Sequence, residues 1–368
     1  MIIVLVLVLL VLALLVSGSG MCWYVSHRLL HRTRGRSAMT IAVRAIDKTS
    51  ITLQRTKNTK RAGVFGLQGT DGQAIVGPLL AQSAETVTRE LLALNGHLPP
   101  NTNVAWNTTV YGNTFLPSLH LAIKEIRVAG ALGALPAWYV PGSQDTWAIL
   151  VHGATGTREQ TLRACKTLAD CGLHLLAMTY RNDEGAPASG SSHLGATEWQ
   201  DLEAAVHYAL DHEARTIVLY GWSLGGTIVE VFLDRSPLAN AIQAVVLDSP
   251  VLNWRETLKS LTRKNHLPPF IAKGTEKLIE RRTGVRFDDL DQTRPGKVQK
   301  PPTLLFHGEE DTTAPVAVSE TFAASQASVT YHRVGGAEHT QCWNADPAAY
   351  ERHLRAFLTG VLRPLSVS

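Results

Sequence analysis

The sequence predicts an α/β protein whose mainly parallel sheet is flanked by helices on both faces. Short, fully apolar runs alternate with longer amphipathic segments from residue 147 onwards. Such apolar runs are typical of strands that are buried on both faces of a parallel sheet. The chain has 368 residues, of which 45% are apolar, so a sizeable core can form. Strands are expected at residues 148–151, 173–180, 217–220, 244–247 and 329–334, and helices at 160–170, 197–211 and 224–233.

The region before this alternation is richer in strand patterns. A turn signal at Thr70-Asp-Gly72 suggests a hairpin over residues 65–76, whereas residues 85–94 have helical spacing. We interpret residues 38–121 as a small β-rich accessory region packed on the main domain, and a separate binding domain is the alternative. The other expected strands lie at residues 41–46, 50–53, 122–128 and 137–140, the last two as the antiparallel start of the main sheet.

The N-terminus predicts a membrane anchor. Residues 2–16 form an unbroken run of fifteen apolar residues, and no charged side chain occurs through Val25. A helix over residues 1–25 spans about 37 Å at about 1.5 Å per residue, enough to cross a hydrocarbon core of about 30 Å. A cleaved signal peptide is the alternative, but no basic segment precedes the run and no clear A-x-A site follows it. We therefore expect a transmembrane helix at 1–25 and a basic juxtamembrane linker at 26–37.

The charge pattern indicates a side of the membrane. Between Arg28 and Arg61 there are ten Lys or Arg and a single acid, Asp47, although the formal net charge of the chain is only +4. The positive-inside rule then predicts a single-pass protein of the cell membrane with its catalytic domain in the cytoplasm. The basic segment is expected to face anionic lipid. Nucleic acid is not an expected partner, because no aromatic residues interleave with these charges.

Residues 221–225 read Gly-Trp-Ser-Leu-Gly, a G-x-S-x-G pattern placed between an expected strand and an expected helix. In that setting the pattern predicts a nucleophile elbow, with Ser223 as the nucleophile. The backbone N–H of the following residue, Leu224, is expected to stabilise an oxyanion. The apolar run 147–151 ends in His-Gly, so the second donor is expected to be the N–H of Ala154 or Thr155. We expect His152 to brace this loop.

An acid and a base follow in the chain order Ser, acid, His. The apolar strand that begins at residue 303 runs into a turn containing Asp311, and the strand at 329–334 is followed by His339. Asp248 also ends an expected strand and is the alternative acid, but its position before Ser-Pro suits a turn or cap. Cys342 is expected to be a buried, inert thiol. Because the metal-binding motifs H-E-x-x-H and paired C-x-x-C are absent from the sequence, we expect no metal and no cofactor.

These motifs resemble the α/β-hydrolase superfamily, and more narrowly membrane-anchored bacterial BEM46-like and prolyl-oligopeptidase-like serine hydrolases. The resemblance covers roughly residues 138–358, with its narrower marks at 180–187, 247–250 and 339–343. It implies a catalytic triad of Ser223, Asp311 and His339. Where commoner relatives have an Arg-Gly-His-Gly loop, this chain reads Arg-Asn-Asp-Glu-Gly at 181–185, so substrate pockets of ordinary esterases are a poor guide.

The hydrolase domain is expected at residues 122–363, with a short helical lid at 253–300. Helical patterns at 254–264 and 271–282 flank Leu-Pro-Pro at 267–269. The expected activity is hydrolysis of a carboxylic ester, with thioester or amide as further options and a peptide less favoured, through an acyl-enzyme. The expected substrate is a small-molecule or lipid-like acyl compound. The alternative is a catalytically silent hydrolase fold that acts as a membrane scaffold or binds a ligand.

Overall fold

The computed structural model describes residues 18–31, 38–112, 115–294 and 300–362. The apolar run 2–16 that predicts the membrane anchor lies outside these ranges, as do Arg32, Arg34 and Arg36. Within the described ranges, no helix combines the length and the apolar character needed to cross a membrane.

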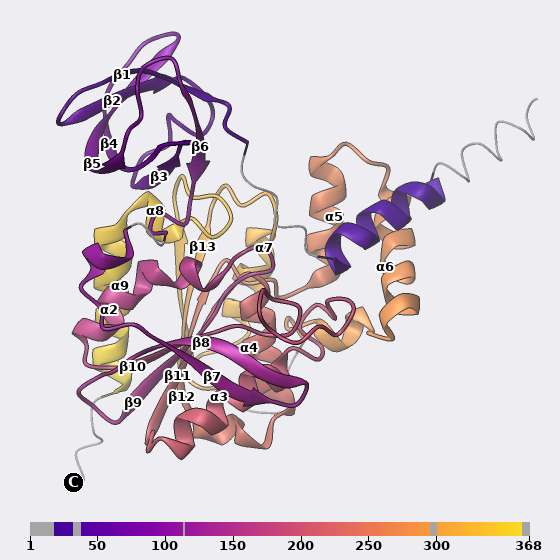
Figure 1. Cartoon of the computed structure of the whole chain (residues 1–368). Helices are drawn as coiled ribbons and strands as arrows, with labels where there is room; N and C mark the ends of the chain where they lie inside the picture. Colours follow the sequence, from indigo (N-terminus) through magenta and orange to yellow (C-terminus); the bar gives the residue numbers. More distant parts are fainter. Residues whose placement is uncertain (1–17, 32–37, 113–114, 295–299, 363–368) are drawn as a thin grey trace, which may run out of the picture.

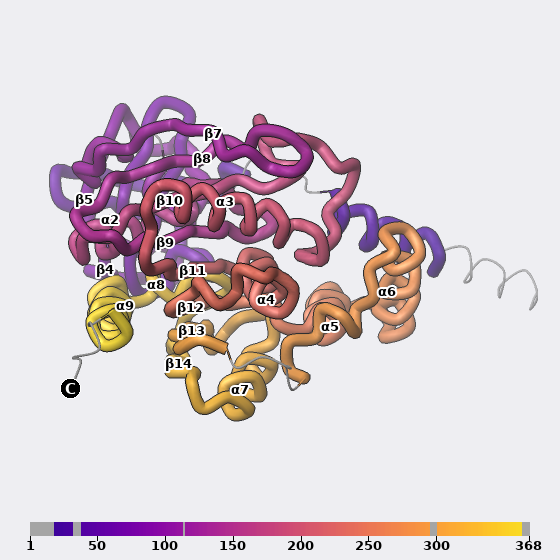
Figure 2. Tube along the Cα trace, turned by 90° about the horizontal axis from the view of Figure 1, so that it is seen from below, coloured from indigo at the N-terminus to yellow at the C-terminus, as the bar shows by residue number. Residues whose placement is uncertain are grey.

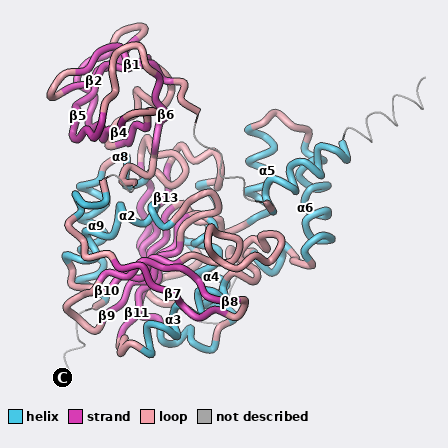
Figure 3. Tube along the Cα trace, viewed as in Figure 1, coloured by secondary structure: helices cyan, strands magenta, loops and turns pink. Residues whose placement is uncertain are grey.

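The accessory region is a closed barrel of six strands, drawn in indigo and purple in Figure 1 and built from strands and loops (Figure 3). Alternate side chains such as Val43, Ile51 and Leu53 are fully buried, so the barrel has an apolar core of its own. In pairing order the strands are β1 (Ile41–Ile46), β2 (Ser50–Gln54), β5 (Thr86–Gly96), β4 (Gly72–Gln82), β3 (Phe65–Gln68) and β6 (Asn103–Asn107).

The helical spacing of residues 85–94 gave a wrong prediction, because this segment lies in strand β5. The strand pairs antiparallel with both β2 and β4. Val87 and Arg89 alternate into the barrel, whereas Glu90 and Leu92 are exposed. The β-branched run Thr-Val-Thr at 86–88 also favours a strand. Long-range pairing therefore outweighs the local spacing.

The main domain has the predicted sheet, which is mixed at one edge. Its order is β14-β13-β12-β11-β9-β10-β8-β7, and all neighbours from β14 to β10 pair in parallel. The antiparallel edge consists of β8 and β7. The strands are β7 (Lys124–Gly130), β8 (Gly133–Val140), β9 (Thr146–Val151), β10 (His174–Met178), β11 (Thr216–Trp222), β12 (Ile242–Asp248), β13 (Thr303–Gly308) and β14 (Val329–Val334).

Helices cover both faces of this sheet, as Figure 2 shows. One face packs against α3 (Trp199–Asp211), α4 (Leu224–Arg235) and α7 (Val316–Ala324). The other face packs against α2 (Leu162–Asp170) and α9 (Pro347–Val361), with the short α8 (Cys342–Ala345) before it. The carboxyl ends of the parallel strands meet at one edge, where side chains from different loops can converge.

The segment predicted as a lid contains two helices, α5 (Trp254–Lys264) and α6 (Pro269–Thr283). A further helix at residues 18–30 lies beside them (Figure 1). It continues across the boundary predicted after Val25, so the linker is not a separate segment at that point. Arg282 Nη1 of α6 donates to Ser26 Oγ at 2.9 Å. The N-terminal helix is thus docked on α6.

Candidate active site

Ser223 occupies the sharp turn between strand β11 and helix α4. Its backbone has φ 53° and ψ −116°, a conformation that L-residues rarely adopt. The approach of neighbouring backbone demands glycine on both sides: a Cβ on Gly221 would lie 2.6 Å from the carbonyl oxygen of Gly225. A Cβ on Gly225 would lie 2.0 Å from the carbonyl oxygen of Val151. The local sequence therefore folds into a strained elbow that presents the serine side chain.

The structure brings Ser223, His339 and Asp311 together at the carboxyl edge of the sheet. His339 follows β14, and its Nε2 lies 2.8 Å from Ser223 Oγ. Asp311 follows β13, and its Oδ2 lies 2.6 Å from His339 Nδ1. The three residues form one hydrogen-bonded chain although the serine and the histidine are 116 positions apart. This arrangement lets an imidazole take a proton from a serine hydroxyl.

The Asp311 carboxylate is held by several donors. Its Oδ1 accepts the backbone N–H groups of Thr313 at 2.7 Å and Ala314 at 2.9 Å. Its Oδ2 also lies 3.2 Å from Nε2 of the buried His307 in β13, for which the sequence predicted no role. Burial raises the pKa of the Asp311 carboxyl. The charge and hydrogen bonds of His339 and His307 lower this pKa by a larger amount, so it lies below the ordinary value.

The alternative acid, Asp248, is placed differently. It is fully buried and accepts hydrogen bonds from Ser249 Oγ and Tyr350 Oη, each at 3.0 Å. Ser249 Oγ in turn accepts the backbone N–H of Thr340 at 3.0 Å. Asp248 therefore supports the loop that carries the histidine, but it makes no hydrogen bond with His339 among the described contacts.

The loop after β9 lies against the serine. A Cβ on Gly153 would lie 3.0 Å from Ser223 Cβ, and the N–H of Gly153 is taken by Gln160 Oε1 at 2.8 Å. Ala154 and Thr155 line the same cavity as the serine. Among the described residues, no acceptor is found for their backbone N–H groups. The N–H of Leu224 belongs to the first residue of α4, where a helical amide has no intrahelical acceptor.

His152 holds the loop after β9 in place through both of its ring nitrogens. Its Nδ1 contacts the carbonyl oxygen of Gly153 at 2.9 Å, and its Nε2 contacts Asp183 Oδ2 at 2.8 Å. Its ring stacks on Tyr180 with centroids 4.7 Å apart. Asp183 belongs to the segment 181–185 in which the chain departs from commoner hydrolases. That segment therefore supports the loop beside the serine, which could not be inferred from its spacing.

The barrel also contacts the histidine loop. Arg61, in the loop between β2 and β3, bonds Glu338 Oε1 at 2.8 Å through Nη2 and donates to the carbonyl oxygen of Gly336 at 2.9 Å through Nη1. Lys57 from the same loop bonds Glu338 at 2.7 Å. Glu338 directly precedes His339 in the sequence. No local pattern predicts a contact between residues that lie 277 positions apart.

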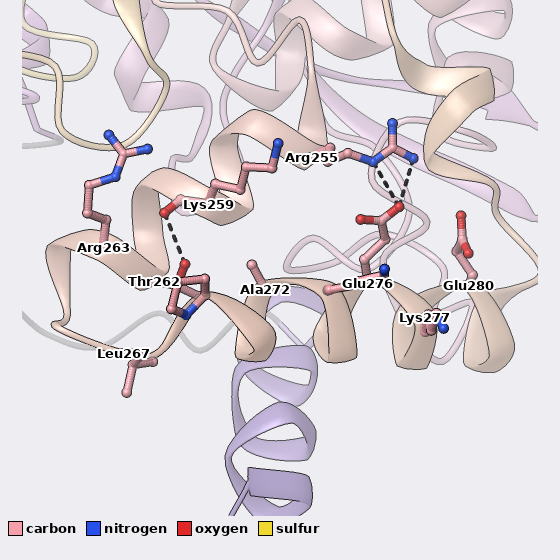
Figure 4. A pocket seen from close by; sticks show the side chains of 11 residues that line it. Arg255, Lys259, Thr262, Arg263, Leu267, Ala272, Glu276, Lys277 and Glu280 are labelled. Atoms are coloured by element: carbon pink, nitrogen blue, oxygen red, sulfur yellow. Dashed lines mark hydrogen bonds and ion pairs between the residues drawn. The ribbon is translucent and has the colours of Figure 1, made fainter.

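A cavity of about 710 Å³ opens over Ser223 and His339, a volume typical of small-molecule sites. Its walls come from the β9 loop, helix α5 and the N-terminal helix, and they are mainly apolar. A second hollow of about 570 Å³ lies between α5 and α6, lined by charged side chains such as Arg255, Glu276 and Lys277 (Figure 4). Neither Ser223 nor His339 lines this second hollow.

No group of His, Cys, Asp or Glu within the described part of the chain is arranged to hold a metal ion. Cys342 is 1% exposed, and its Sγ lies 3.8 Å from Ser249 Oγ. Burial raises the pKa of this thiol well above its ordinary value.

The sequence matches two known families. The prolyl oligopeptidase family matches residues 187–357, and a domain of unknown function (DUF8805) matches residues 42–107, which include most of the barrel. The human Protein ABHD12B is 25% identical over 208 residues, which cover 53% of this chain and 54% of that protein. The chain thus spans about half the length of this relative.

Solved structures show the same fold. The Pyrococcus furiosus esterase Pf2001 superposes with a TM-score of 0.53 at 20% identity, covering 68% of this chain and 98% of that one. Est1E from Butyrivibrio proteoclasticus, solved with ferulic acid bound, gives a TM-score of 0.51 at 17% identity and covers 65% of this chain and 100% of its own. The mixed sheet, the strained elbow and these structural similarities show that the chain has the α/β-hydrolase fold.

Proposed function

We propose that this chain cleaves a carboxylic ester through a covalent acyl-enzyme on Ser223. The observation that carries the proposal is the continuous hydrogen-bond chain from Asp311 through His339 to Ser223, with contacts of 2.6 and 2.8 Å. Two backbone N–H groups that have no acceptor in the described part of the chain, those of Ala154 and Thr155, lie along the same cavity. Nucleophile, base, acid and oxyanion donors are therefore available at one point.

The proposed reaction has two steps. Ser223 Oγ attacks the ester carbonyl while His339 Nε2 takes the hydroxyl proton, and Asp311 stabilises the imidazolium that forms. The amide of Leu224 and that of Ala154 or Thr155 stabilise the tetrahedral oxyanion; a single lost donor of this kind typically costs about 3 kcal/mol. The imidazolium then protonates the leaving alcohol. Water attacks the acyl-enzyme with His339 as base, which releases the acid and restores the serine.

Peptide or amide hydrolysis is the second candidate, because the prolyl oligopeptidase family matches residues 187–357. The mainly apolar walls of the cavity favour an ester with an apolar acyl group. Of the two solved structures described above, Pf2001 is named an esterase, and Est1E was solved with ferulic acid bound. We therefore place ester cleavage first.

We also propose that the chain is anchored to a membrane through residues 2–16, with its catalytic domain in the cytoplasm. The described residues that follow this run offer support. Trp23 is 53% exposed, Tyr24 is 50% exposed, and Phe270 on the adjacent helix α6 is 61% exposed. Trp and Tyr are enriched at membrane interfaces, where one side of the ring meets lipid and the polar group meets water.

The activity is tested with the full-length chain in a neutral detergent. A 4-nitrophenyl ester and the matched 4-nitroanilide of the same acyl group separate ester from amide cleavage. Ser223→Ala should abolish hydrolysis of both, whereas Ser325→Ala, a serine at the end of α7, should retain full activity. A wild-type chain that hydrolyses neither compound would favour the catalytically silent alternative.

A further inference from the structure

One wall of the catalytic cavity is the N-terminal helix at residues 18–30. Met21, Tyr24, Val25, Arg28 and Leu29 all line the cavity. Their spacing of three and four residues places them on one face of the helix. This segment therefore contributes to the site, although the sequence assigned it only to an anchor and a linker.

Other faces of the same helix fix its position. Cys22 packs so close to α6 that a Cβ on Gly274 would lie 2.7 Å from its sulfur. Ser26 accepts the hydrogen bond from Arg282, and the carbonyl oxygen of Leu30 accepts the backbone N–H of Ser192 at 2.8 Å. Contacts at both ends of the helix hold the lining face over the serine. The wall is thus part of the folded domain.

The lining combines an apolar interior with positive charge near solvent. Val25, Val251 and Trp254 contribute apolar surface, and Val251 and Trp254 are buried. Two exposed cations also line the cavity, Arg28 from the N-terminal helix and Lys264 from the end of α5. None of the described residues that line the cavity is Asp or Glu. An apolar chain and a nearby anion would therefore be accommodated together.

The described neighbours of these two cations leave both positive charges without an ion pair. Arg28 Nη1 donates to the neutral Tyr24 hydroxyl at 3.2 Å, and its guanidinium lies 5.8 Å from the Tyr24 ring centroid. Glu338, whose pKa Lys264 helps to lower, is already bonded to Lys57 and Arg61 at 2.7 and 2.8 Å. Arg28 and Lys264 form no ion pair within 4.0 Å among the described residues. Both cations remain available to a ligand.

We propose that the substrate is an ester that joins an apolar acyl chain to an alcohol bearing a negative charge, such as a phosphate or a carboxylate. This inference rests on the proposed function. The acyl chain lies against the apolar wall that includes Val25, and the anionic group is bound by Arg28 and Lys264. Hydrolysis consumes one water. The bond between the acyl carbon and the alcohol oxygen breaks, the water oxygen bonds to the acyl carbon with one proton, and the other proton leaves with the anionic alcohol.

The test compares two esters with the same acyl chain, 1-decanoyl glycerol 3-phosphate and neutral 1-decanoyl glycerol, with the full-length chain in neutral detergent. The expected kcat/KM favours the phosphate by about tenfold, because an exposed charge pair contributes about two- to fivefold and two cations act together. Arg28→Gln with Lys264→Gln should bring the ratio close to one. The matched control is Lys259→Gln with Arg263→Gln. It also removes two positive charges, but from the side of α5 that faces α6. The control should keep the ratio.

Each outcome discriminates. A wild-type ratio near one, with Ser223-dependent hydrolysis of the neutral ester intact, would overturn the charge preference and leave the proposed function standing. Equal loss of the ratio in the control pair would also overturn it, because the effect would then reflect overall charge. Absence of Ser223-dependent hydrolysis of both esters would overturn the proposed function itself. A repeat with water-soluble butanoyl esters separates recognition of a free ester from recognition of a lipid in a surface.

Discussion

Replacing Asp311 with Asn should reverse the direction of the hydrogen bond with His339. Asp311 Oδ1 accepts two backbone N–H groups, from Thr313 and Ala314, so in the variant the amide oxygen must occupy that position. The NH₂ group then takes the place of Oδ2, which lies 2.6 Å from His339 Nδ1. An NH₂ group donates, so Nδ1 must accept. The proton then resides on Nε2, the atom that should receive the proton of Ser223.

This wrong tautomer should lower kcat by about 10⁴-fold, the loss typical of such a change, which corresponds to about 5 kcal/mol of activation free energy. Burst and steady-state hydrolysis of a 4-nitrophenyl ester measure the loss. Thermal unfolding with circular dichroism checks that the variant is folded. KM should change little, because Asp311 does not line the cavity.

Asp248→Asn is the matched control, a buried aspartate at the end of a neighbouring strand. Its partners are Ser249 and Tyr350, so kcat should fall by less than about tenfold. Its cost should appear as about 1–3 kcal/mol of unfolding free energy, because buried donors lose a charged acceptor. A larger loss of kcat from Asp248→Asn than from Asp311→Asn would refute the reasoning and assign the acid to the end of β12.

Three further predictions follow from other contacts. Arg61→Ala should lower kcat by about tenfold with little change in KM, because the loop before His339 loses its contacts with Arg61. Arg61→Lys should recover part of the lost kcat. Equal kcat in the wild type and both variants would show that Arg61 does not position this loop. Val25→Phe should shift the acyl-length profile toward shorter chains, and an unchanged profile would remove the helix from the binding wall. A cysteine at Lys259, whose side chain is 49% exposed, should resist a membrane-impermeant thiol reagent in intact cells, and rapid labelling would place the domain outside.

The sequence was most informative where neighbouring residues carry the information. The elbow at Ser223 needs only a strand, five consecutive residues and a helix, all of which are visible as a pattern. The alternation of apolar runs likewise predicted the sheet and its parallel character, because buried strands and amphipathic helices differ in length and period. Chain order then suggested that Asp311 and His339 would meet the serine.

Features that depend on distant residues were not predictable. The segment in β5 satisfied a helical period, and only pairing with β2 and β4 closes it into a barrel. The contact of Arg61 with Glu338 and that of His152 with Asp183 join separate elements, so the spacing of residues along the sequence does not predict them. The N-terminal helix lines the cavity because Gly274 and Arg282 on α6 position it. The hydropathy of the sequence does not predict this packing against α6.

Covalent labelling of Ser223 is the decisive experiment for the proposed activity. The full-length chain is treated with a fluorophosphonate probe, digested, and the modified peptide is located by mass spectrometry. We expect one adduct on Ser223, which is lost in Ser223→Ala and forms much more slowly in His339→Ala, because the imidazole at 2.8 Å must take the hydroxyl proton. A wild-type chain without an adduct, or labelling that persists in Ser223→Ala, would contradict the proposed activity.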